Sequence, residues 1–302
     1  VRFMKWDLTY HYKNKEDYQK EFNEAQAMIA EFEKYQGKLN TYEGFLNFCL
    51  LEKKFIEKAY RLYQYSSLKS DLNKKNVENA SEIAKCRMLL YAFSEATSFE
   101  LPEVISIGSD KIMGFIGRDP RLAEFKFEFE KIFRNADHIL DEKSEKLLTL
   151  FGPLESSGSE LYSALAVGDG KSVEVELSNS KKVVVTQSNY RSLIADSQDA
   201  EDRRKIFEAI FNNYEEHKNI FATIYNTVLL ADKAEAKSRG YKNSLEAHLY
   251  GNNISLEVYY NLVEVAGTYN ESLKKYLKIR QEYLKLPVIH TYDRFIELAS
   301  SN

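Results

Sequence analysis

One long amphipathic stretch, residues 199–239, constrains the fold more than any other part of the sequence. Its apolar residues recur at helical spacing, and Glu201 and Asp202 stand near its start, where the helix dipole favours negative charge. Basic residues occupy its last turns, and Gly240 follows as a typical helix-ending residue. The pattern predicts one continuous helix with the apolar stripe Ile206, Ile210, Phe211, Tyr214, Ile220, Phe221, Ile224, Val228 and Ala231.

The rest of the sequence also favours helices. Only 4 prolines and 12 glycines occur among 302 residues, and both residue types are unfavourable inside a helix. Before residue 140, five helices are predicted. The first covers 15–35, and the second runs from a capping box of Asn40 and Glu43 to a polar break at 68–76. The third covers 77–98, the fourth runs from Leu101 to Gly114 and Gly117, and the fifth begins at Pro120. The helix over 77–98 is predicted to face inward with Ala80, Ile83, Ala84, Met88 and Tyr91.

The second half of the chain continues this pattern. Helices are predicted from Asp141 to Gly152-Pro153, from a capping box of Ser157 and Glu160 to Val167, and over 189–195. Ser244 and Ser255 are predicted N-caps of the next two helices, and the last long helix ends at Pro287. The apolar stripe of that last helix includes Tyr259, Leu262, Val263, Leu273 and Tyr276. The sequence therefore predicts a mostly α fold.

Two short runs break the helical pattern. Valines alternate with other residues around Val173 and Val175, and again at Val183 and Val185, with Ser178-Asn179-Ser180 between the runs. Period-two alternation on both sides of a turn predicts a β-hairpin with one buried face. An isolated two-stranded ribbon is only marginally stable, so we expect it to lean on helices.

Composition excludes several classes of protein. The net charge is −4, with acidic and basic residues interspersed, so no basic surface for nucleic acid is expected. No stretch reaches the roughly 20 apolar residues that span a bilayer, and residues 1–7 lack the apolar core of a secretion signal. Cys49 and Cys86 lie on apolar helix faces and are expected to be buried free thiols, which suits a cytoplasmic, reducing compartment.

The histidines do not form a zinc-peptidase motif. None of His11, His138, His217, His248 and His290 is followed by glutamate, whereas the His-Glu-x-x-His motif places two histidines and a glutamate on one helical turn. The cluster around His217 is better explained as a solvated helix face, His248 as a packing residue, and His290 as part of an exposed linker. No catalytic, cofactor-binding or metal residue is predicted.

Nucleophile and phosphate motifs are also missing. Serines at 156–159 are explained by helix capping, and a nucleophile elbow would need an α/β sheet around it. The Gly168-Asp169-Gly170-Lys171 turn lacks the P-loop pattern. Charged runs such as Glu52-Lys53-Lys54 are most simply solvated helix faces.

A series of short motifs carries a resemblance to a known family through their order along the chain. They are Trp6-Asp7-Leu8, Arg61 to Tyr65, Leu101-Pro102-Glu103, residues 125–150, Asp202 to Lys205, Arg239-Gly240-Tyr241, Leu249 to Asn253 and His290 to Asp293. In this order the chain resembles the first half of oligoendopeptidase F, a family of thimet-oligopeptidase-like zinc peptidases. The motifs are loose individually, and their order over almost the whole chain makes the resemblance specific.

The resemblance implies a cytosolic, mostly helical, two-lobed peptidase with an enclosed groove for short peptides. In that family two histidines of His-Glu-x-x-His and a downstream glutamate hold zinc, and the glutamate of the motif is the general base. No position of this chain matches these residues. The resemblance also implies an N-terminal helical region at 1–117, a small helical domain with the hairpin at 118–187, and the first helices of an incomplete catalytic domain at 188–302.

Two hypotheses about function follow. In the first, the chain is the N-terminal portion of a zinc metalloendopeptidase, whether as a fragment, a split gene product or a natural truncation. It would be inactive alone, and its last helices would expose apolar surface that a C-terminal catalytic half covers. In the second, the chain is a non-catalytic helical scaffold that binds peptides, since its 21 tyrosines suit the walls of a peptide groove. Neither hypothesis involves nucleic acid or a membrane.

Overall fold

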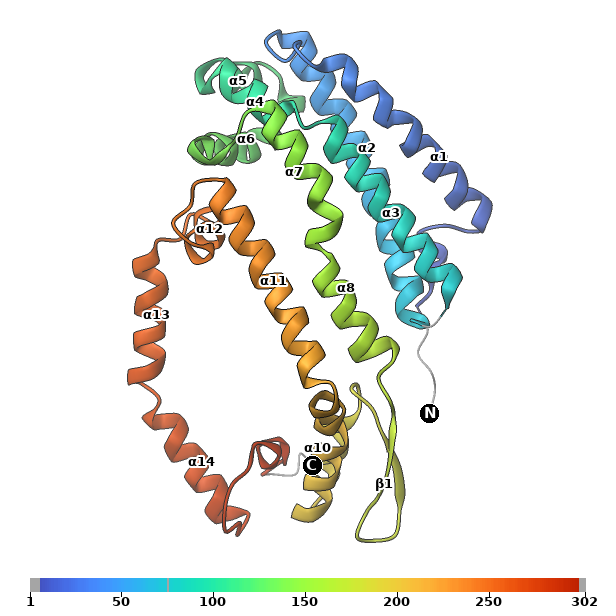
Figure 1. Cartoon of the computed structure of the whole chain (residues 1–302), viewed down its shortest axis with the longest axis vertical. Coiled ribbons are helices and arrows are strands. Elements are labelled where there is room, and N and C mark those ends of the chain that lie inside the picture. The colour runs from blue at the N-terminus through green and yellow to red at the C-terminus, as the bar shows by residue number, and fades with distance from the viewer. Residues whose placement is uncertain (1–5, 75, 299–302) are drawn as a thin grey trace. The chain divides into compact units, whose positions relative to one another are not determined.

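The computed structural model describes residues 6–74 and 76–298. Helices form most of this part of the chain, and its one sheet has two strands, so the predicted mostly α fold with a single hairpin is confirmed (Figure 1). Most of the N-terminal stretch that was considered as a secretion signal, Val1 to Lys5, lies outside the described residues.

Contacts within the chain divide it into two compact units. One unit comprises Val1–Ser157 and Ala231–Gly251, and the other comprises Gly158–Leu230 and Asn252–Asn302. The chain therefore leaves the first unit and returns to it once. The three-part domain division expected from the resemblance stays a prediction.

The first unit is built from helices packed around a long central helix, α2. Its α-helices are α1 (Lys15–Phe32), α2 (Tyr42–Leu72), α3 (Val77–Ala96), α4 (Glu100–Ile107), α5 (Ser109–Arg118), α6 (Lys126–Arg134), α7 (Glu142–Glu155) and α12 (Ser244–Tyr250). Short 3-10 helices are η1 (Leu8–Tyr10), η2 (Glu33–Tyr35), η3 (Pro120–Phe125) and η4 (Ala136–His138). The last turns of α11 (Lys218–Ser238) also belong to this unit.

Aromatic side chains form the centre of this core. The Phe32 ring contacts the rings of Phe48, Phe55 and Phe93, with centroids 5.0 to 5.9 Å apart, and Phe55 stacks on Phe93 at 4.5 Å. Replacing one buried phenylalanine by alanine costs about 3–5 kcal/mol, so this cluster fixes how α1, α2 and α3 pack. Cys49 and Cys86 are buried and free, as predicted.

The inward face of α3 differs from the prediction. Met88 is 58% exposed, and Ala80 and Ala84 are exposed as well. The buried face instead carries Ile83, Cys86, Leu89 and Phe93, together with the polar Asn79 and Glu82. Those two polar residues are satisfied by Lys69, whose carbonyl accepts from the Asn79 amide at 2.9 Å and whose ammonium meets Glu82 at 2.7 Å. Hydrophobic spacing alone misplaced the face because buried polar residues lie on it.

Several predicted boundaries in this unit are wrong. Thr41, not Asn40, caps α2 by accepting from the Gly44 N–H. The same helix continues to Leu72, through part of the predicted polar break. Gly108, with φ +93°, ends α4, whereas the expected terminators Gly114 and Gly117 lie inside α5.

The helix from Asp141 also runs past its predicted end. Pro153 lies inside α7, and the Tyr91 hydroxyl donates to the Gly152 carbonyl at 3.3 Å. The same carbonyl accepts from the Ser156 N–H at 3.4 Å, so the helix continues past the proline. At Ser157, where a capping box is predicted, the hydroxyl donates to the Leu154 carbonyl at 2.6 Å, and Ser157 is the first residue of α8.

The second unit contains the hairpin and the last helices. Its elements are α8 (Ser157–Ser163), the π-helical turn η5 (Ala164–Gly168), β1 (Val173–Glu176), β2 (Lys182–Val185), α9 (Tyr190–Asp196), α10 (Ala200–Glu216), the first turns of α11, α13 (Leu256–Thr268), α14 (Glu271–Tyr283) and η6 (Thr291–Phe295). The hairpin is antiparallel, and Val175 and Val185 are buried beside Ile206 and Ile210 of α10. The predicted hairpin with one buried face is confirmed.

The predicted long helix is two helices. Asp199 caps the first, α10, by accepting from the N–H groups of Glu201 and Asp202. The helix breaks at His217, where φ is −113° and ψ is 16°, and α11 begins at the next residue. The sequence Glu215-Glu216-His217-Lys218 has no apolar side chain that packing could use to hold a continuous helix here.

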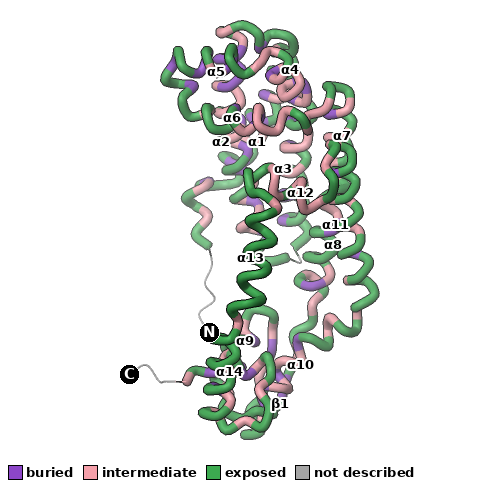
Figure 2. The backbone as a smooth tube through the Cα atoms, turned by 90° about the vertical axis from the view of Figure 1, so that its left-hand side faces the viewer, coloured by how far each residue is buried: buried purple, intermediate pink, exposed green. Residues whose placement is uncertain are grey.

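The predicted last helix is also two helices, α13 and α14, separated at Tyr269 and Asn270. Ser255 caps α13 as predicted, whereas Asn243 rather than Ser244 caps α12. The apolar stripe of these last helices is exposed: Leu262 is 65% and Leu273 58% accessible (Figure 2).

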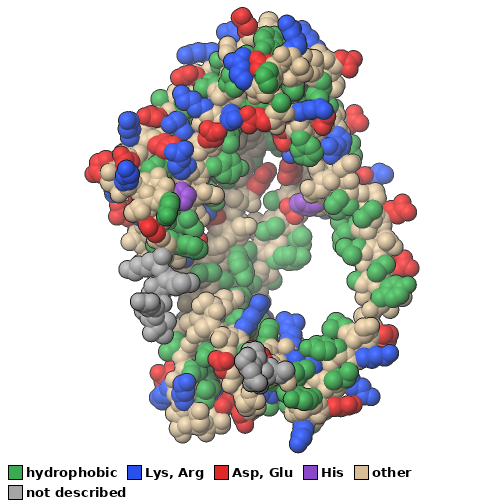
Figure 3. All heavy atoms as spheres, turned by 180° about the vertical axis from the view of Figure 1, so that it is seen from behind, with side chains coloured by type: hydrophobic (Ala, Val, Ile, Leu, Met, Phe, Trp, Pro, Cys, Tyr) green, Lys and Arg blue, Asp and Glu red, His purple; other side chains and the backbone are tan. Residues whose placement is uncertain are grey.

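Charge and hydropathy agree with the composition. On the face drawn in Figure 3, basic and acidic side chains are intermixed, with hydrophobic side chains between them. Among the described residues, no helix combines the length and the hydropathy needed to cross a bilayer.

Candidate functional site

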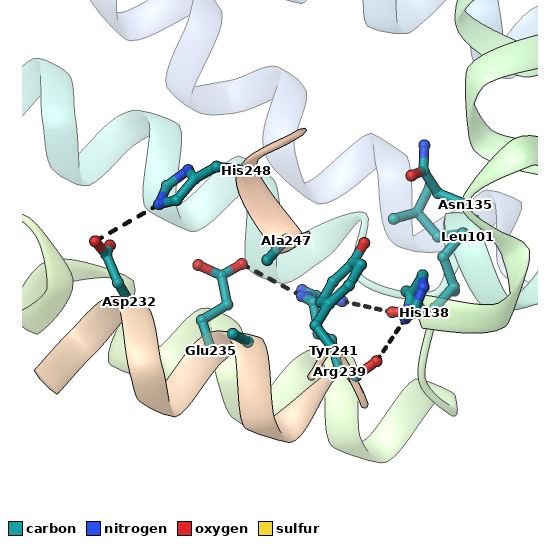
Figure 4. Close-up of a pocket in the computed structure, with 11 residues that line it drawn as sticks. Leu101, Asn135, His138, Asp232, Glu235, Arg239, Tyr241, Ala247 and His248 are labelled. Atoms are coloured by element: carbon teal, nitrogen blue, oxygen red, sulfur yellow. Dashed lines mark hydrogen bonds and ion pairs between the residues drawn. The ribbon is translucent and has the colours of Figure 1, made fainter. Parts of the chain in front are cut away.

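A cavity of about 320 Å³ lies in the first unit at the C-terminal end of α11 (Figure 4). Its walls come from α4, from the segment around η4, from α11 and from α12. The lining residues are Leu101, Asn135, His138, Ile139, Asp232, Glu235, Ala236, Arg239, Tyr241, Ala247 and His248. It brings together two of the sequence's histidines and the Arg239-Gly240-Tyr241 motif.

A partly buried ion pair supports this cavity. The Arg239 guanidinium donates to both carboxylate oxygens of Glu145, at 2.9 and 3.2 Å, and to the His138 carbonyl at 3.3 Å. Glu145 is 5% exposed and also accepts from the Leu140 N–H at 2.9 Å. Burial opposes the charge on Arg239, but the hydrogen bonds that Arg239 donates to Glu145 and Glu235, together with the negative charges of these carboxylates, outweigh burial and raise the pKa of Arg239.

His138 is held by its surroundings on three sides. Its Nδ1 lies 2.8 Å from the Arg239 carbonyl, so Nδ1 must carry the proton that is donated there. Its ring stacks on Tyr241 at 3.6 Å and meets the edge of Tyr250 at 4.7 Å. The Tyr250 hydroxyl in turn donates to the Arg134 carbonyl at 3.2 Å. These contacts make His138 a packing residue that fixes the turn after α11.

Gly240 allows that turn to form. Its φ is +76°, a left-handed conformation that glycine adopts without strain. The Tyr241 N–H then reaches back to the Ala236 carbonyl at 2.9 Å, as in a Schellman motif. The predicted C-terminal role of Gly240 is confirmed, and it places Tyr241 against His138.

The acidic wall of the cavity is already paired. His248 Nε2 lies 3.6 Å from Asp232 Oδ2, and Glu235 accepts from Arg239 Nε at 3.3 Å (Figure 4). The His248 side chain is 69% exposed, so the packing role predicted for it is wrong. Among the residues that line the cavity, none is a serine, threonine, cysteine or lysine, so no nucleophile stands beside a base. The arrangement holds the turn after α11.

Zinc has no suitable donor set in the described chain. Within residues 6–74 and 76–298, no group of three histidine, cysteine, aspartate or glutamate side chains could hold a metal ion. Structural and catalytic zinc sites use three or four such donors. The residues present do not fit this metal, and no chemical step is assigned to it.

His217 and His290 lie outside this cavity, in different surroundings. The ring of His217 is half-buried, and its Nδ1 lies 2.9 Å from the Asn213 carbonyl at the end of α10. His290 itself is exposed, as expected, but the residues after it form a short 3-10 helix with a buried aspartate rather than a free linker. Asp293, which is 1% exposed, pairs with Arg203 at 2.9 Å and accepts from the His290 N–H at 2.8 Å. The spacing of His290 and Asp293, three residues apart, is the capping signal that sequence reasoning missed.

A third cluster was missed because it lies in a charged run. Glu52, expected on a solvated face, is half-buried near Glu100 and Glu128. Burial, reinforced by the charge of Glu128, raises the pKa of Glu52 to about 7. Burial together with the charge of Glu52 raises the pKa of Glu100 as well. Burial also raises the pKa of the neighbouring Cys49 thiol, which keeps that sulfur unreactive.

Comparisons with known proteins extend this description. Residues 103–171 match the family model described as oligopeptidase F, and residues 193–299 match the model of peptidase family M3. Oligopeptidase PepF of Bacillus subtilis is 29% identical over 97% of this chain and 44% of its own length. An oligoendopeptidase F homolog of Borreliella burgdorferi is also 29% identical, over 97% of this chain and 49% of its own.

A solved structure agrees with these relatives. The crystal structure of oligoendopeptidase-F from Enterococcus faecium superposes with a TM-score of 0.88 at 25% identity, covering 95% of this chain and 57% of that one. The chain spans about half the length of the curated relatives it matches.

Proposed function

Because this chain belongs to the oligoendopeptidase F group of peptidase family M3, we propose that it is the N-terminal portion of a zinc metalloendopeptidase that hydrolyses short peptides. The observation that carries the proposal is the extent of the alignments. They run over 97% of this chain and over 44% and 49% of two relatives. The oligopeptidase F model matches ahead of the peptidase model, in the order expected of a first half.

The chain by itself is inactive under this proposal. Its sequence contains no His-Glu-x-x-His segment, and its described residues offer no three-donor metal site. Its own residues supply the framework instead. Glu145, His138 and Arg239 fix the turn after α11, and Asp293 with Arg203 fixes the segment after α14.

We place the protein in the cytoplasm and divide it into three functional regions, 1–117, 118–187 and 188–302. The two buried free cysteines support a reducing compartment. The matched segments 103–171 and 193–299 support a separate middle region and the start of a catalytic region.

The test is metal content and cleavage by the purified chain. After incubation with Zn²⁺ and gel filtration, we expect substoichiometric zinc by mass spectrometry and no chelator-sensitive hydrolysis of quenched fluorescent peptides. Full-length oligopeptidase PepF of Bacillus subtilis serves as the positive control in the same peptide mixture. One zinc per chain together with cleavage that EDTA abolishes would contradict the proposal.

The alternative, a non-catalytic helical scaffold that binds peptides, is favoured by exposed aromatic side chains. Tyr260 and Tyr269 are 58% and 76% exposed on and just after α13. A titration of the chain with random short peptides separates the two functions. A scaffold binds tightly without any second polypeptide and stays monomeric, whereas an incomplete peptidase gains activity when a catalytic half is added.

A further inference from the structure

The two edges of the hairpin can be distinguished from its register. Val173 pairs with Val185 and Glu176 with Lys182, and the Leu177 N–H donates to the Lys181 carbonyl at 2.9 Å. Hydrogen-bonded and non-bonded pairs alternate along an antiparallel ladder. The backbone groups of Glu174 and Glu176 therefore point away from β2, and those of Lys182 and Val184 point away from β1.

The outer edge of β2 is covered at its C-terminal end. The Asn189 side-chain amide donates to the Val184 carbonyl at 2.9 Å, and its oxygen accepts from the Thr186 N–H at 2.7 Å. This side chain makes the same pair of contacts that a residue of a neighbouring strand would make. No further strand can pair there without displacing Asn189.

The outer edge of β1 is open over most of its length. At its end, Lys205 Nζ contacts the Glu176 carbonyl at 3.3 Å, and Asp202 accepts from the Ser178 N–H beyond the strand. Within the described residues, the N–H and C=O of Glu174 and the N–H of Glu176 have no hydrogen-bond partner. Both residues are exposed, and the opposite face of the strand packs on α10 (Figure 1).

The open edge also carries two carboxylates, Glu174 and Glu176, on the exposed face of β1. Two cations lie beside them among the described residues: Lys182 is 3.0 Å from Glu174, and Lys205 contacts the backbone carbonyl of Glu176, which leaves the Glu176 carboxylate available to a basic side chain. A residue of an added strand opposite Glu174 would place its side chain on this same face, about 5 Å away. A lysine or arginine at that position is therefore favoured, and an acidic residue is disfavoured.

We propose that the outer edge of β1 binds an extended basic peptide as a third strand. Backbone pairing with Glu174 and Glu176 supplies affinity, and their carboxylates select for positive charge. The choice of a peptide as the ligand rests on the proposed function. The test measures binding rather than cleavage, so failure of one claim leaves the other standing.

The decisive variant is Glu174→Pro, with Lys182→Pro as its matched control. Proline removes an outward N–H at either position and leaves the β1–β2 hydrogen bonds intact. The probe is a fluorescein-labelled octapeptide of alternating lysine and valine, compared with its glutamate counterpart by fluorescence anisotropy at low salt. We expect the wild type to bind the lysine peptide and not the glutamate peptide. The affinity for the lysine peptide should fall about tenfold or more in Glu174→Pro and change less than twofold in Lys182→Pro. A Glu174→Gln, Glu176→Gln variant should bind more weakly and depend less on salt.

Several outcomes would overturn the proposal. They are absence of binding by the wild type, equal binding of the acidic peptide, or unchanged affinity in Glu174→Pro with a normal melting curve. If Glu174→Pro fails to fold, amide exchange of the wild type decides: the peptide must slow exchange at Glu174 and Glu176. Unchanged exchange there would contradict it. A concentration-dependent dimer without peptide, lost on the same substitution, would show that two hairpins pair with each other instead.

Discussion

At the scale of single residues, the Arg239-Gly240-Tyr241 motif has a structural explanation. Arg239 pairs with Glu145, Gly240 adopts the left-handed turn, and Tyr241 stacks on His138. Each residue type is needed for its geometry, which gives the whole motif a structural role. The first unit uses these residues to hold the end of α11.

Removing Arg239 should destabilise the first unit. Arg239→Ala leaves the Glu145 carboxylate, 7% exposed at its side chain, without its cation, and we expect a loss of about 3 kcal/mol in the free energy of unfolding by urea. Lys53→Ala, which breaks the exposed pair with Glu124, is the control and should cost less than about 1 kcal/mol. Equal effects of the two substitutions would mean that the Arg239 contact adds nothing beyond a surface pair.

Glu52 should make stability depend on pH. Because burial raises the pKa of Glu52 to about 7, the folded state binds a proton that the unfolded state releases at lower pH. This contribution to stability is fully present below about pH 4.5 and is lost as the pH rises through about 7. Glu52→Gln should therefore be more stable than the wild type at pH 8, by roughly 1–2 kcal/mol, with the difference vanishing near pH 4.5.

Thermal melts at pH 4.5, 6 and 8 measure this difference. Glu57→Gln changes an exposed carboxylate on the same helix and serves as the control, with a shift that stays small across the series. A Glu52→Gln variant that is less stable than the wild type at pH 8 would show that Glu52 is charged and stabilising in the fold.

At the scale of elements, local sequence predicted most helices and the hairpin but not where they break. The valines at 173, 175, 183 and 185 define the hairpin because alternation is a local signal. The inward face of α3 and the burial of Asp293 depend on distant partners, Lys69 and Arg203. The cavity was not predicted because His138 and Arg239 lie 101 positions apart. Tertiary contacts decided each of these cases, and they leave no periodic trace in the sequence.

The last helices expose apolar side chains, and under the proposed function a second half covers them. Leu262 on α13 and Leu273 on α14 are 65% and 58% accessible, and patches of this kind are rare on monomeric soluble proteins. We expect concentration-dependent association of the purified chain by sedimentation velocity. The double substitution Leu262→Lys, Leu273→Lys should shift it towards monomer.

Met88→Lys provides the control for that shift. Met88 is a comparably exposed apolar residue, 58% accessible, on α3, and its substitution should leave the association unchanged. A wild-type chain that stays monomeric at high concentration would show that α13 and α14 need no partner.

At the scale of the whole molecule, two compact units of one chain correspond to about half of each relative. Similarity to this group of peptidases rests on matched segments and a superposable structure. Under the proposed function, activity depends on residues that this sequence does not contain. The chain described here carries framework residues such as Arg239 and Arg203, and the proposal assigns chemistry to a second half.

The coding sequence around this chain decides whether a second, catalytic half exists. Sequencing of the DNA through the codon for Asn302, and of the adjoining reading frames, should find a His-Glu-x-x-His segment followed by a downstream glutamate codon. Finding that segment in the same frame or in a neighbouring one is the predicted result. A complete adjoining sequence that encodes no such segment would contradict the account and favour a non-catalytic protein.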